Sequence, residues 1–193
     1  MTIQIKNVCK SFNDQLVLNN INLELANNHI YCLMGPSGMG KTTLLRIILG
    51  LETKDSGAIK GIKRGEIATM FQENRLCEEL TPIDNVMLVI PGKASRAAIR
   101  NNLAQILPAD CLNQPVSELS GGMKRRVALA RTMNYPSKMI IMDEPFTGLD
   151  VNTKKNVIHY LRSMRNGRIT LITTHSEEDV SLLDAHKISL EDL

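Results

Sequence analysis

The sequence has no tryptophan, and phenylalanine and tyrosine together make up only 3 % of its 193 residues. Because 43 % of the residues are nevertheless hydrophobic, the chain can build a core, but that core must be mostly aliphatic and methionine-rich. No apolar run approaches the ~20 residues that a membrane-spanning helix needs, and residues 1–6 contain no apolar signal segment. If this protein works at a membrane, something other than these segments must therefore hold it there.

A large excess of either charge is also missing, because the formal net charge is only +3. Nucleic-acid-binding proteins usually carry a concentrated basic face, so we expect no nucleic-acid partner. The densest basic run, Lys124-Arg125-Arg126, is interpreted as a solvated helix face. The cysteines at positions 9, 32, 77 and 111 form no C-x-x-C pair, which disfavours a metal site or a disulfide framework and indicates reduced thiols in a cytosolic protein.

The feature around which the chain is organised is a glycine-rich segment at positions 35–42, here called the phosphate loop. It matches the pattern G-x-x-x-x-G-K-[ST]. It consists of Gly35, Pro36, Ser37, Gly38, Met39, Gly40, Lys41 and Thr42. Residues 29–34 before it read as a buried strand, and residues 43–49 after it read as a helix that stops at Gly50. This strand–loop–helix context is the one in which such a loop binds nucleoside triphosphates.

Each residue type in the phosphate loop suits phosphate chemistry. Glycines allow the backbone N–H groups to approach an anion, and the following helix adds its positive N-terminal end. Lys41 supplies a cation for the β- and γ-phosphates, and the Thr42 hydroxyl is placed to ligate Mg²⁺. The competing interpretation is a glycine-rich turn that binds nothing.

The remaining pattern predicts an α/β fold, with strands and helices that alternate after a β-rich start. Residues 2–34 read as strands separated by turns at Asn19-Asn20 and Asn27-Asn28, and a short strand is expected within residues 55–65. Further strands are expected at residues 67–71, 139–142 and 169–174. Helices are expected from Thr81-Pro82 to a break at Pro91-Gly92, then at residues 94–107, after Ser120, and at residues 152–164 and 177–183.

Two further segments carry chemistry. Asp143 and Glu144 follow a continuous apolar strand, so one carboxylate can serve a metal while the other faces an attacking water. An acidic loop without function is the alternative. Leu119-Ser120-Gly121-Gly122 precedes a helix, and it fits either a second anion site or a simple N-terminal cap at Ser120.

The order of the motifs points to a known family. Along the chain come the phosphate loop, Gln72 after a strand, Leu119-Ser120-Gly121-Gly122, Met142-Asp143-Glu144-Pro145, Gly148-Leu149-Asp150 and His175. In this order and spacing they resemble the nucleotide-binding subunit of an ATP-binding-cassette (ABC) transporter, and the resemblance covers nearly the whole chain.

This resemblance implies ATP and Mg²⁺ as ligands. Phe12 would stack on adenine, and Thr43 would join the phosphate loop around the phosphates. Asp143 would hold Mg²⁺ through water, beside Thr42. Gln72 would touch Mg²⁺ or the attacking water and report the nucleotide state to a partner.

The resemblance also implies catalysis in a head-to-tail dimer with two ATP at the interface. Glu144 would be the general base, and His175 would contact the γ-phosphate. Ser120-Gly121-Gly122 of one subunit would close over the ATP held by the other, and Gly148-Leu149-Asp150 would lie at the dimer interface.

The implied architecture is a single ABC-type P-loop ATPase domain over residues 1–193. Residues 1–72 and 119–193 would form a mainly parallel core with an antiparallel β subdomain, and residues 73–118 would form an inserted helical subdomain. That subdomain would receive transmembrane permease subunits, with residues 76–80 as the coupling surface, at the inner face of the cell membrane. Residues 71–76 and 80–86 are similar to bacterial importers, especially those of the nitrate, sulfonate and taurine type, and this likeness implies a solute-binding protein as an indirect partner.

Some features depart from the family pattern and leave alternatives open. Met123 stands where Gln or Glu is usual, residues 57–67 are shorter than usual, and the chain stops soon after His175. A soluble ABC ATPase with a role in assembly, division or translation is one alternative, and a nucleotide-gated binding module with little hydrolysis is another. The transported solute, the direction of transport and the choice between two identical and two different subunits do not follow from the sequence.

Overall fold

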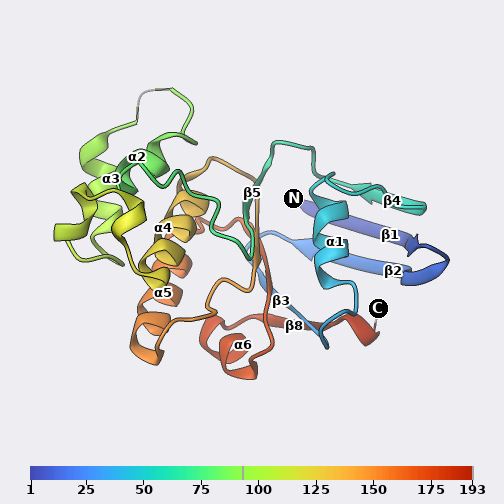
Figure 1. Cartoon of the computed structure of the whole chain (residues 1–193). Coiled ribbons are helices and arrows are strands. Elements are labelled where there is room, and N and C mark those ends of the chain that lie inside the picture. Colours follow the sequence, from blue (N-terminus) through green and yellow to red (C-terminus); the bar gives the residue numbers. More distant parts are fainter. Residues whose placement is uncertain (93, 193) are drawn as a thin grey trace. The chain divides into compact units, whose positions relative to one another are not determined.

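The computed structural model describes residues 1–92 and 94–192, so Lys93, inside the predicted helical subdomain, and Leu193 lie outside the described residues. The chain forms two compact units (Figure 1). The first comprises Met1–Ile67, Ser137–Asp143 and the described residues from Gly167 onwards, and the second comprises Ala68–Pro136 and Glu144–Asn166. The division into a core and a helical subdomain at residues 73–118 stays a prediction.

The first unit contains a three-stranded antiparallel sheet of order β2-β1-β4. Its strands are β1 (Thr2–Phe12), β2 (Gln15–Ala26) and β4 (Ser56–Lys60). Alternation buries Ile3 and Ile5 on one face of β1, as expected for a strand with one face on the core.

The predicted turn at Asn19-Asn20 is wrong, because β2 runs through it without a break. Asn20 instead takes a left-handed φ of 54° inside the strand, where the register with β1 shifts. Its side-chain oxygen accepts a hydrogen bond from Asn7 Nδ2 at 2.7 Å. A local turn signal has thus become a bulge, since pairing with β1 continues on both sides of it. The turn predicted at Asn27-Asn28 is confirmed.

The second sheet has five strands in the order β5-β6-β7-β3-β8. They are β5 (Ile67–Met70), β6 (Met139–Asp143), β7 (Ile169–Thr173), β3 (Ile30–Met34) and β8 (His186–Ser189). β7 pairs in parallel with both β6 and β3, and β8 pairs in parallel with β3. Because parallel strands end at the same edge of a sheet, Asp143 at the end of β6 lies at the edge from which the phosphate loop leaves β3.

An aliphatic cluster fills the first unit, as the composition predicts. Helix α1 (Lys41–Ile48) contributes Leu44 and Ile48, which pack with Leu33 of β3 and Leu171 of β7 in one buried group. Helix α6 (Glu177–Leu183) and a 3-10 turn at Leu190–Asp192 belong to the same unit. α1 therefore rests on the sheet whose strand ends carry the site residues.

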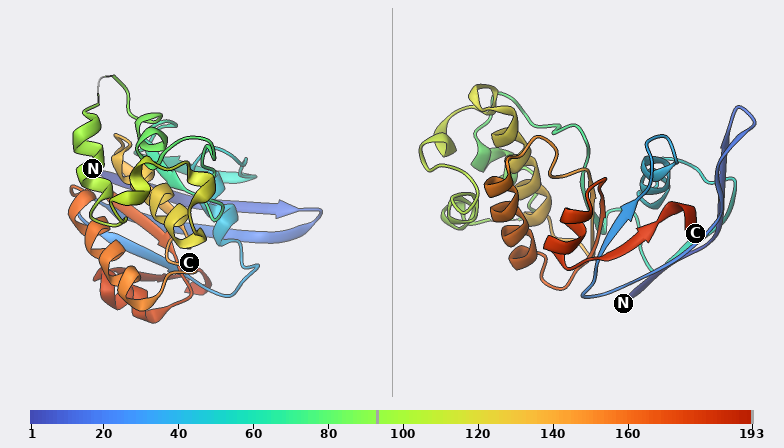
Figure 2. Two further views of the ribbon diagram at one scale, coloured as in Figure 1. Left: turned by 60° about the vertical axis from the view of Figure 1, so that its left-hand side comes forward. Right: turned by 90° about the horizontal axis from the view of Figure 1, so that it is seen from below.

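The second unit is mainly helical (Figures 1 and 2). Its helices are α2 (Pro82–Met87), α3 (Arg96–Leu103), α4 (Gly121–Asn134) and α5 (Val151–Met164), with 3-10 turns at Asp110–Asn113 and Val116–Glu118. Thr81 caps α2 by accepting a bond from the Asp84 amide, and Pro82 is its first residue, as predicted. α3 is shorter than the predicted 94–107, because residues after Leu103 turn with tighter bonds such as Ile106 N to Leu103 O.

The expectation that Lys124-Arg125-Arg126 forms a solvated face is wrong at its centre. Arg125 is only 6 % exposed. Lys124 does lie at the surface, where it pairs with Glu78 at 2.7 Å, and Arg126 donates to the carbonyl of Ile106. A helix turns about 100° per residue, so neighbouring side chains cannot all share one face.

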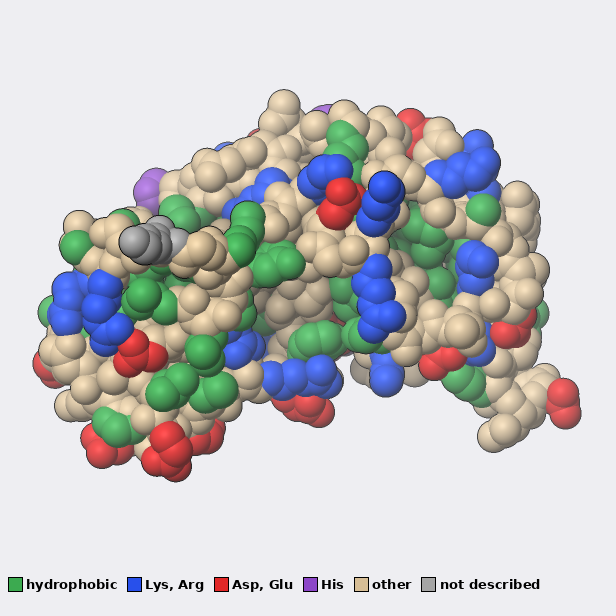
Figure 3. Space-filling model, turned by 90° about the horizontal axis from the view of Figure 1, so that it is seen from above, with side chains coloured by type: hydrophobic (Ala, Val, Ile, Leu, Met, Phe, Trp, Pro, Cys, Tyr) green, Lys and Arg blue, Asp and Glu red, His purple; other side chains and the backbone are tan. Residues whose placement is uncertain are grey.

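The surface drawn in Figure 3 has no continuous basic area. Lys and Arg side chains form several separate groups there, with acidic, apolar and neutral atoms between them. Among residues 1–92 and 94–192, no helix has both the length and the apolar character that crossing a membrane requires.

Cys32 offers a test of the core. It lies on β3 with no exposed surface, and burial raises the pKa of its thiol from 9.0 to about 12. We expect Cys32 to resist iodoacetamide at about pH 8.5 while the exposed Cys77 reacts, because the thiolate is the nucleophile. Mass spectrometry of labelled peptides measures this, and equal labelling of the two thiols in folded protein would contradict the structure. The stability that comes from the protonated thiol is present below pH 9.0 and is lost as pH rises towards 12.

Candidate active site

The phosphate loop connects β3 to α1 through a backbone that only glycine adopts easily. Gly35, Gly38 and Gly40 have φ values of 145°, 84° and 98°. Gly40 immediately precedes α1 and lies in a crowded position, since a Cβ there would meet Leu18 Cδ2 at 2.9 Å and Val17 Cγ1 at 3.0 Å. Pro36, Ser37 and Gly38, at the tip of the loop, are exposed. The loop is therefore shaped by backbone and presents that backbone to a ligand.

Lys41 places its charge inside this loop. Its Nζ donates to the carbonyl oxygens of Gly35 at 2.7 Å and Pro36 at 2.9 Å, and the residue is only 7 % exposed. The ammonium is thus positioned at the helix N-terminus, where the helix dipole adds to its attraction for an anion.

Asp143 lies between two hydroxyl groups of the first unit. Its Oδ1 accepts from Thr173 Oγ1 at 2.5 Å, and its Oδ2 accepts from Thr42 Oγ1 at 3.3 Å. Thr173 is directly opposite Asp143 in the β6–β7 pairing. Hydroxyl and carboxylate oxygens are the donors that Mg²⁺ prefers. In the described part of the chain no three His, Cys, Asp or Glu side chains come together as a metal site, so a cation here would also need phosphate or water oxygens.

The first unit also contains Phe12 and His175, both predicted to contact nucleotide. Phe12 ends β1, is 42 % exposed, and lies 4.7 Å from the Lys10 ammonium, measured from the ring centroid. His175 is exposed just after β7. Its loop is held by Thr174, whose hydroxyl donates to Asp179 Oδ2 at 2.5 Å.

Glu144 is the first residue of the second segment of the second unit, Glu144–Asn166. This residue has a left-handed φ of 48°, which costs about 1–3 kcal/mol for a residue other than glycine. Its carboxylate accepts from Thr147 Oγ1 at 3.4 Å, and its carbonyl accepts from Arg125 Nη2 at 2.7 Å. Gln72, on the loop after β5, has an exposed side chain and a carbonyl that Arg125 also binds, at 2.7 Å.

Ser120 is the N-cap of α4, because its Oγ accepts from the Met123 amide at 3.3 Å. The capping interpretation is therefore confirmed, while the anion-binding role stays a prediction. Ser120 and Gly121 are exposed, and a Cβ at Gly122 would lie 3.6 Å from Leu149 and 3.9 Å from the Gly148 carbonyl.

Asp150 caps α5 in a similar way. Its carboxylate accepts from the amides of Asn152 and Thr153. Hydrogen bonds from Thr153 are the largest cause that lowers the pKa of Asp150 below its ordinary value. The role predicted for Gly148-Leu149-Asp150 at a dimer interface is not tested by this local geometry.

The structure brings the predicted residues together in two groups. In the first unit Thr42 and Asp143 are joined, and in the second Gln72 and Glu144 are joined through Arg125. Sequence reasoning missed Thr173 and Arg125. Thr173 is the last residue of a buried strand, and this position at a strand end could have indicated a site residue. Arg125 lies in a run of three basic residues, a pattern that is typical of a solvated surface, so the sequence did not indicate its burial.

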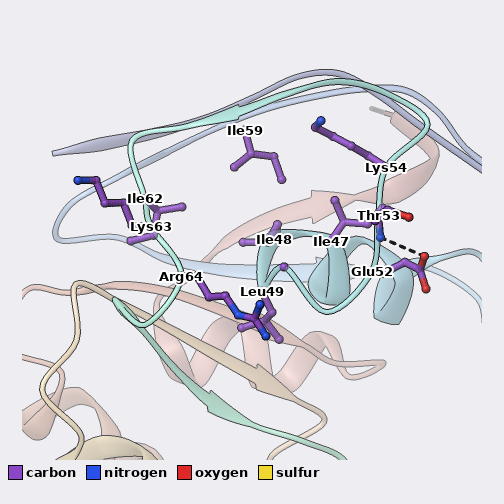
Figure 4. Close-up of a pocket in the computed structure, with 11 residues that line it drawn as sticks. Ile47, Ile48, Leu49, Glu52, Thr53, Lys54, Ile59, Ile62, Lys63 and Arg64 are labelled. Atoms are coloured by element: carbon purple, nitrogen blue, oxygen red, sulfur yellow. Dashed lines mark hydrogen bonds between the residues drawn. The ribbon is translucent and has the colours of Figure 1, made fainter.

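A separate cavity of about 350 Å³ lies beside the C-terminal end of α1. Figure 4 shows Ile47 and Ile48 of α1 on one side of it and Ile59 on the other, with Lys54 and Lys63 at its edges. None of the predicted site residues lines it, and Lys41 is at the other end of α1, about 10 Å along the helix axis from Ile48. This cavity is therefore not the candidate site.

A comparison with known protein families shows to which family this chain belongs. A profile of the family described as ABC transporter matches residues 18–147. The chain belongs to the ABC transporter family. The matched span includes the phosphate loop, Gln72, the Ser120 segment and Asp143-Glu144.

Curated relatives in the ABC transporter family include sulfate/thiosulfate import ATP-binding proteins named CysA. The protein from Pseudomonas aeruginosa is 34 % identical over 199 residues, which cover 93 % of this chain and 60 % of the relative. The protein from Mesostigma viride is 36 % identical over 197 residues, which cover 93 % of this chain and 56 % of the relative. The chain thus spans less than two thirds of the length of these relatives.

Solved ABC transporter cassettes share the fold. MJ0796, described as a bacterial ABC transporter cassette in a dimeric structure, has a TM-score of 0.83 and 25 % identity over 97 % of this chain and 94 % of that chain. A Pyrococcus furiosus ATP-binding protein of ABC transporter type has a TM-score of 0.88 and 24 % identity, covering 100 % of this chain and 98 % of that chain. The α/β fold with a parallel and an antiparallel sheet, predicted from the sequence, is confirmed.

The crowding around Gly40 leads to a test with a matched control. Gly40→Ala should lower the free energy of unfolding by about 1–3 kcal/mol or more, because a Cβ is strained at its φ and also meets Leu18 and Val17. Gly38→Ala suffers backbone strain alone, since its Cβ would meet no atom of the described residues within 4 Å. Urea denaturation compares the two variants, and an equal loss in both would contradict the loop geometry.

Proposed function

We propose that this chain is the ATP-binding and ATP-hydrolysing part of an ABC transporter, which powers solute transport through separate membrane-spanning subunits. The observation that carries this proposal is the Lys41–Thr42–Asp143 arrangement at the end of the parallel sheet. A buried ammonium, a hydroxyl at a helix N-terminus and a carboxylate at a strand end provide the contacts that a Mg²⁺–triphosphate needs. Membership of the ABC transporter family supports the same assignment.

The proposed ligands are ATP and Mg²⁺. Residues 35–43 bind the phosphates, Phe12 stacks on adenine, and Thr42, Asp143 and Gln72 serve the metal. Mg²⁺ neutralises phosphate charge when bound. Glu144 acts as the general base on water, and His175 contacts the γ-phosphate.

The proposed working form is a head-to-tail dimer, with Ser120-Gly121-Gly122 of one subunit over the ATP of the other. The exposure of Ser120 and Gly121 at the N-terminus of a 14-residue helix supports this role. Dimeric MJ0796 structures, one of them described as a post-hydrolysis state bound to ADP and Pi with 26 % identity to this chain, support it as well.

The finer proposal is an importer whose permease subunits contact residues 73–118 at the inner face of the membrane. The curated relatives are named for sulfate/thiosulfate import. The likeness of residues 71–76 and 80–86 to nitrate, sulfonate and taurine importers is kept as a proposal. Both likenesses suggest an oxyanion solute, although the solute would contact other subunits, including a solute-binding protein.

Steady-state ATP turnover and co-purification of membrane-spanning subunits test the function, and a chain that hydrolyses ATP but binds only soluble partners would contradict the transport role.

Glu144→Gln tests the general base. We expect ATP binding to remain, turnover to fall by at least about 10²-fold, and an ATP-bound dimer to accumulate, because the amide keeps the shape but cannot accept the proton from water. Phosphate release and light scattering after gel filtration measure these effects. Glu24→Gln, an exposed change on β2, is the control and should behave as wild type. Wild-type turnover in Glu144→Gln would refute the assignment.

Lys41→Ala tests the phosphate site. We expect ATP affinity to fall by at least about tenfold in calorimetry, since the variant removes the cation that the loop carbonyls position. Lys54→Ala removes an exposed lysine elsewhere in the same unit and should leave affinity unchanged. Equal affinities of the two variants would count against the site.

A further inference from the structure

Arg125 is a buried cation on α4 that connects two loops of the second unit. One loop follows β5 and carries Gln72, and the other follows β6 and begins with Glu144. The arginine is 6 % exposed, so its guanidinium has exchanged water for protein acceptors.

The contacts to the Gln72 loop come from one end of the guanidinium. Nη1 donates to the carbonyls of Phe71 at 2.9 Å and Gln72 at 2.7 Å, and it lies 3.2 Å from Asn74 Oδ1. The backbone of this loop is therefore held while the Gln72 side chain stays exposed.

The contacts to the Glu144 loop come from the other two nitrogens. Nη2 donates to the Glu144 carbonyl at 2.7 Å, and Nε donates to the Pro145 carbonyl at 3.2 Å. Glu144 has the left-handed φ of 48°, a conformation that persists only where its surroundings stabilise it. Two bonds to consecutive carbonyls provide such stabilisation.

The planar guanidinium suits this position. It carries several N–H donors in a rigid fork, whereas a lysine offers a point charge and a glutamine offers donors at one nitrogen only. Neither can reach both loops with the same set of bonds.

We propose that Arg125 is a positioning residue that holds Gln72 and Glu144 as one unit with the helix that begins at Gly121. This inference rests on the proposed function, in which Glu144 is the general base on water and Gln72 serves the metal. Arg125 binds Gln72 and Glu144 through their backbone carbonyls, so it acts on both residues through the backbone that carries them.

Arg131, on the same helix, provides a natural control. It donates to the carbonyls of Asn74 at 3.0 Å and Arg75 at 2.7 Å, so it holds the Gln72 loop. Its described hydrogen bonds do not extend to the Glu144 loop. Substitution of Arg131 therefore loosens the anchoring of the Gln72 loop alone, whereas substitution of Arg125 also removes the link to the Glu144 loop.

Hydrogen–deuterium exchange of the whole chain tests the linkage without reference to catalysis. Arg125→Gln should raise exchange in peptides covering residues 71–75 and also in those covering residues 144–149. Arg131→Gln should raise it only in the first set. Loosening of a single loop in Arg125→Gln, or of both loops in Arg131→Gln, would overturn the proposal.

Turnover tests the consequence. Arg125→Gln should lower kcat by at least about tenfold and leave the calorimetric Kd for ATP within about twofold, because the phosphate loop is untouched. Arg125→Lys, which keeps charge and most of the volume, should give an intermediate kcat and guards against simple misfolding. A kcat in Arg125→Gln equal to that of wild type or of Arg131→Gln would refute the positioning role. Absence of turnover in the wild type would instead refute the proposed function, and the exchange pattern would still decide the linkage.

Discussion

In the parallel sheet β7 lies between β6 and β3, and the candidate site depends on this placement. Pairing with β6 sets Asp143 opposite Thr173, whose hydroxyl binds the carboxylate at 2.5 Å. Pairing with β3 brings the phosphate loop to the same edge, so that Thr42 reaches the other carboxylate oxygen. Because these strands run in the same direction, their carboxyl ends lie at one edge of the sheet. This brings together Thr42 and Asp143, which are 101 positions apart in the chain. The aliphatic cluster on which α1 packs supports this arrangement.

A different kind of interaction organises the second unit. There the loops that carry Gln72 and Glu144 have little regular structure, and their backbone carbonyls bind side chains from α4 instead of a neighbouring strand. Burying a guanidinium costs free energy unless its donors are bonded, so Arg125 and its carbonyl partners stabilise one another. The same helix begins at Gly121 and has Ser120 as its N-cap. Helix α4 therefore connects the two loops with the segment that carries Ser120 and Gly121.

These two arrangements suit the proposed ATPase cycle. The first unit offers fixed contacts for phosphate and metal, and the second carries the proposed base and the exposed start of α4. Family membership and the likeness to dimeric cassettes support completion of the site by a second subunit. In such a design ATP can link two subunits, and its hydrolysis can release them.

The sequence alone determined the features that depend on local order. The phosphate loop between a strand and a helix, the helix start at Thr81-Pro82 and the strand before Asp143 follow from residue type and spacing, and all were predicted correctly. Tertiary structure decided the rest. Asn19-Asn20 became part of a strand because β1 pairs on both sides of it, and Arg125 became buried because two distant loops close over it. The bond of Thr173 to Asp143 likewise arises only when β7 pairs with β6. Local patterns carry no information on which segments meet, since that is set by the packing of the whole sheet and its helices.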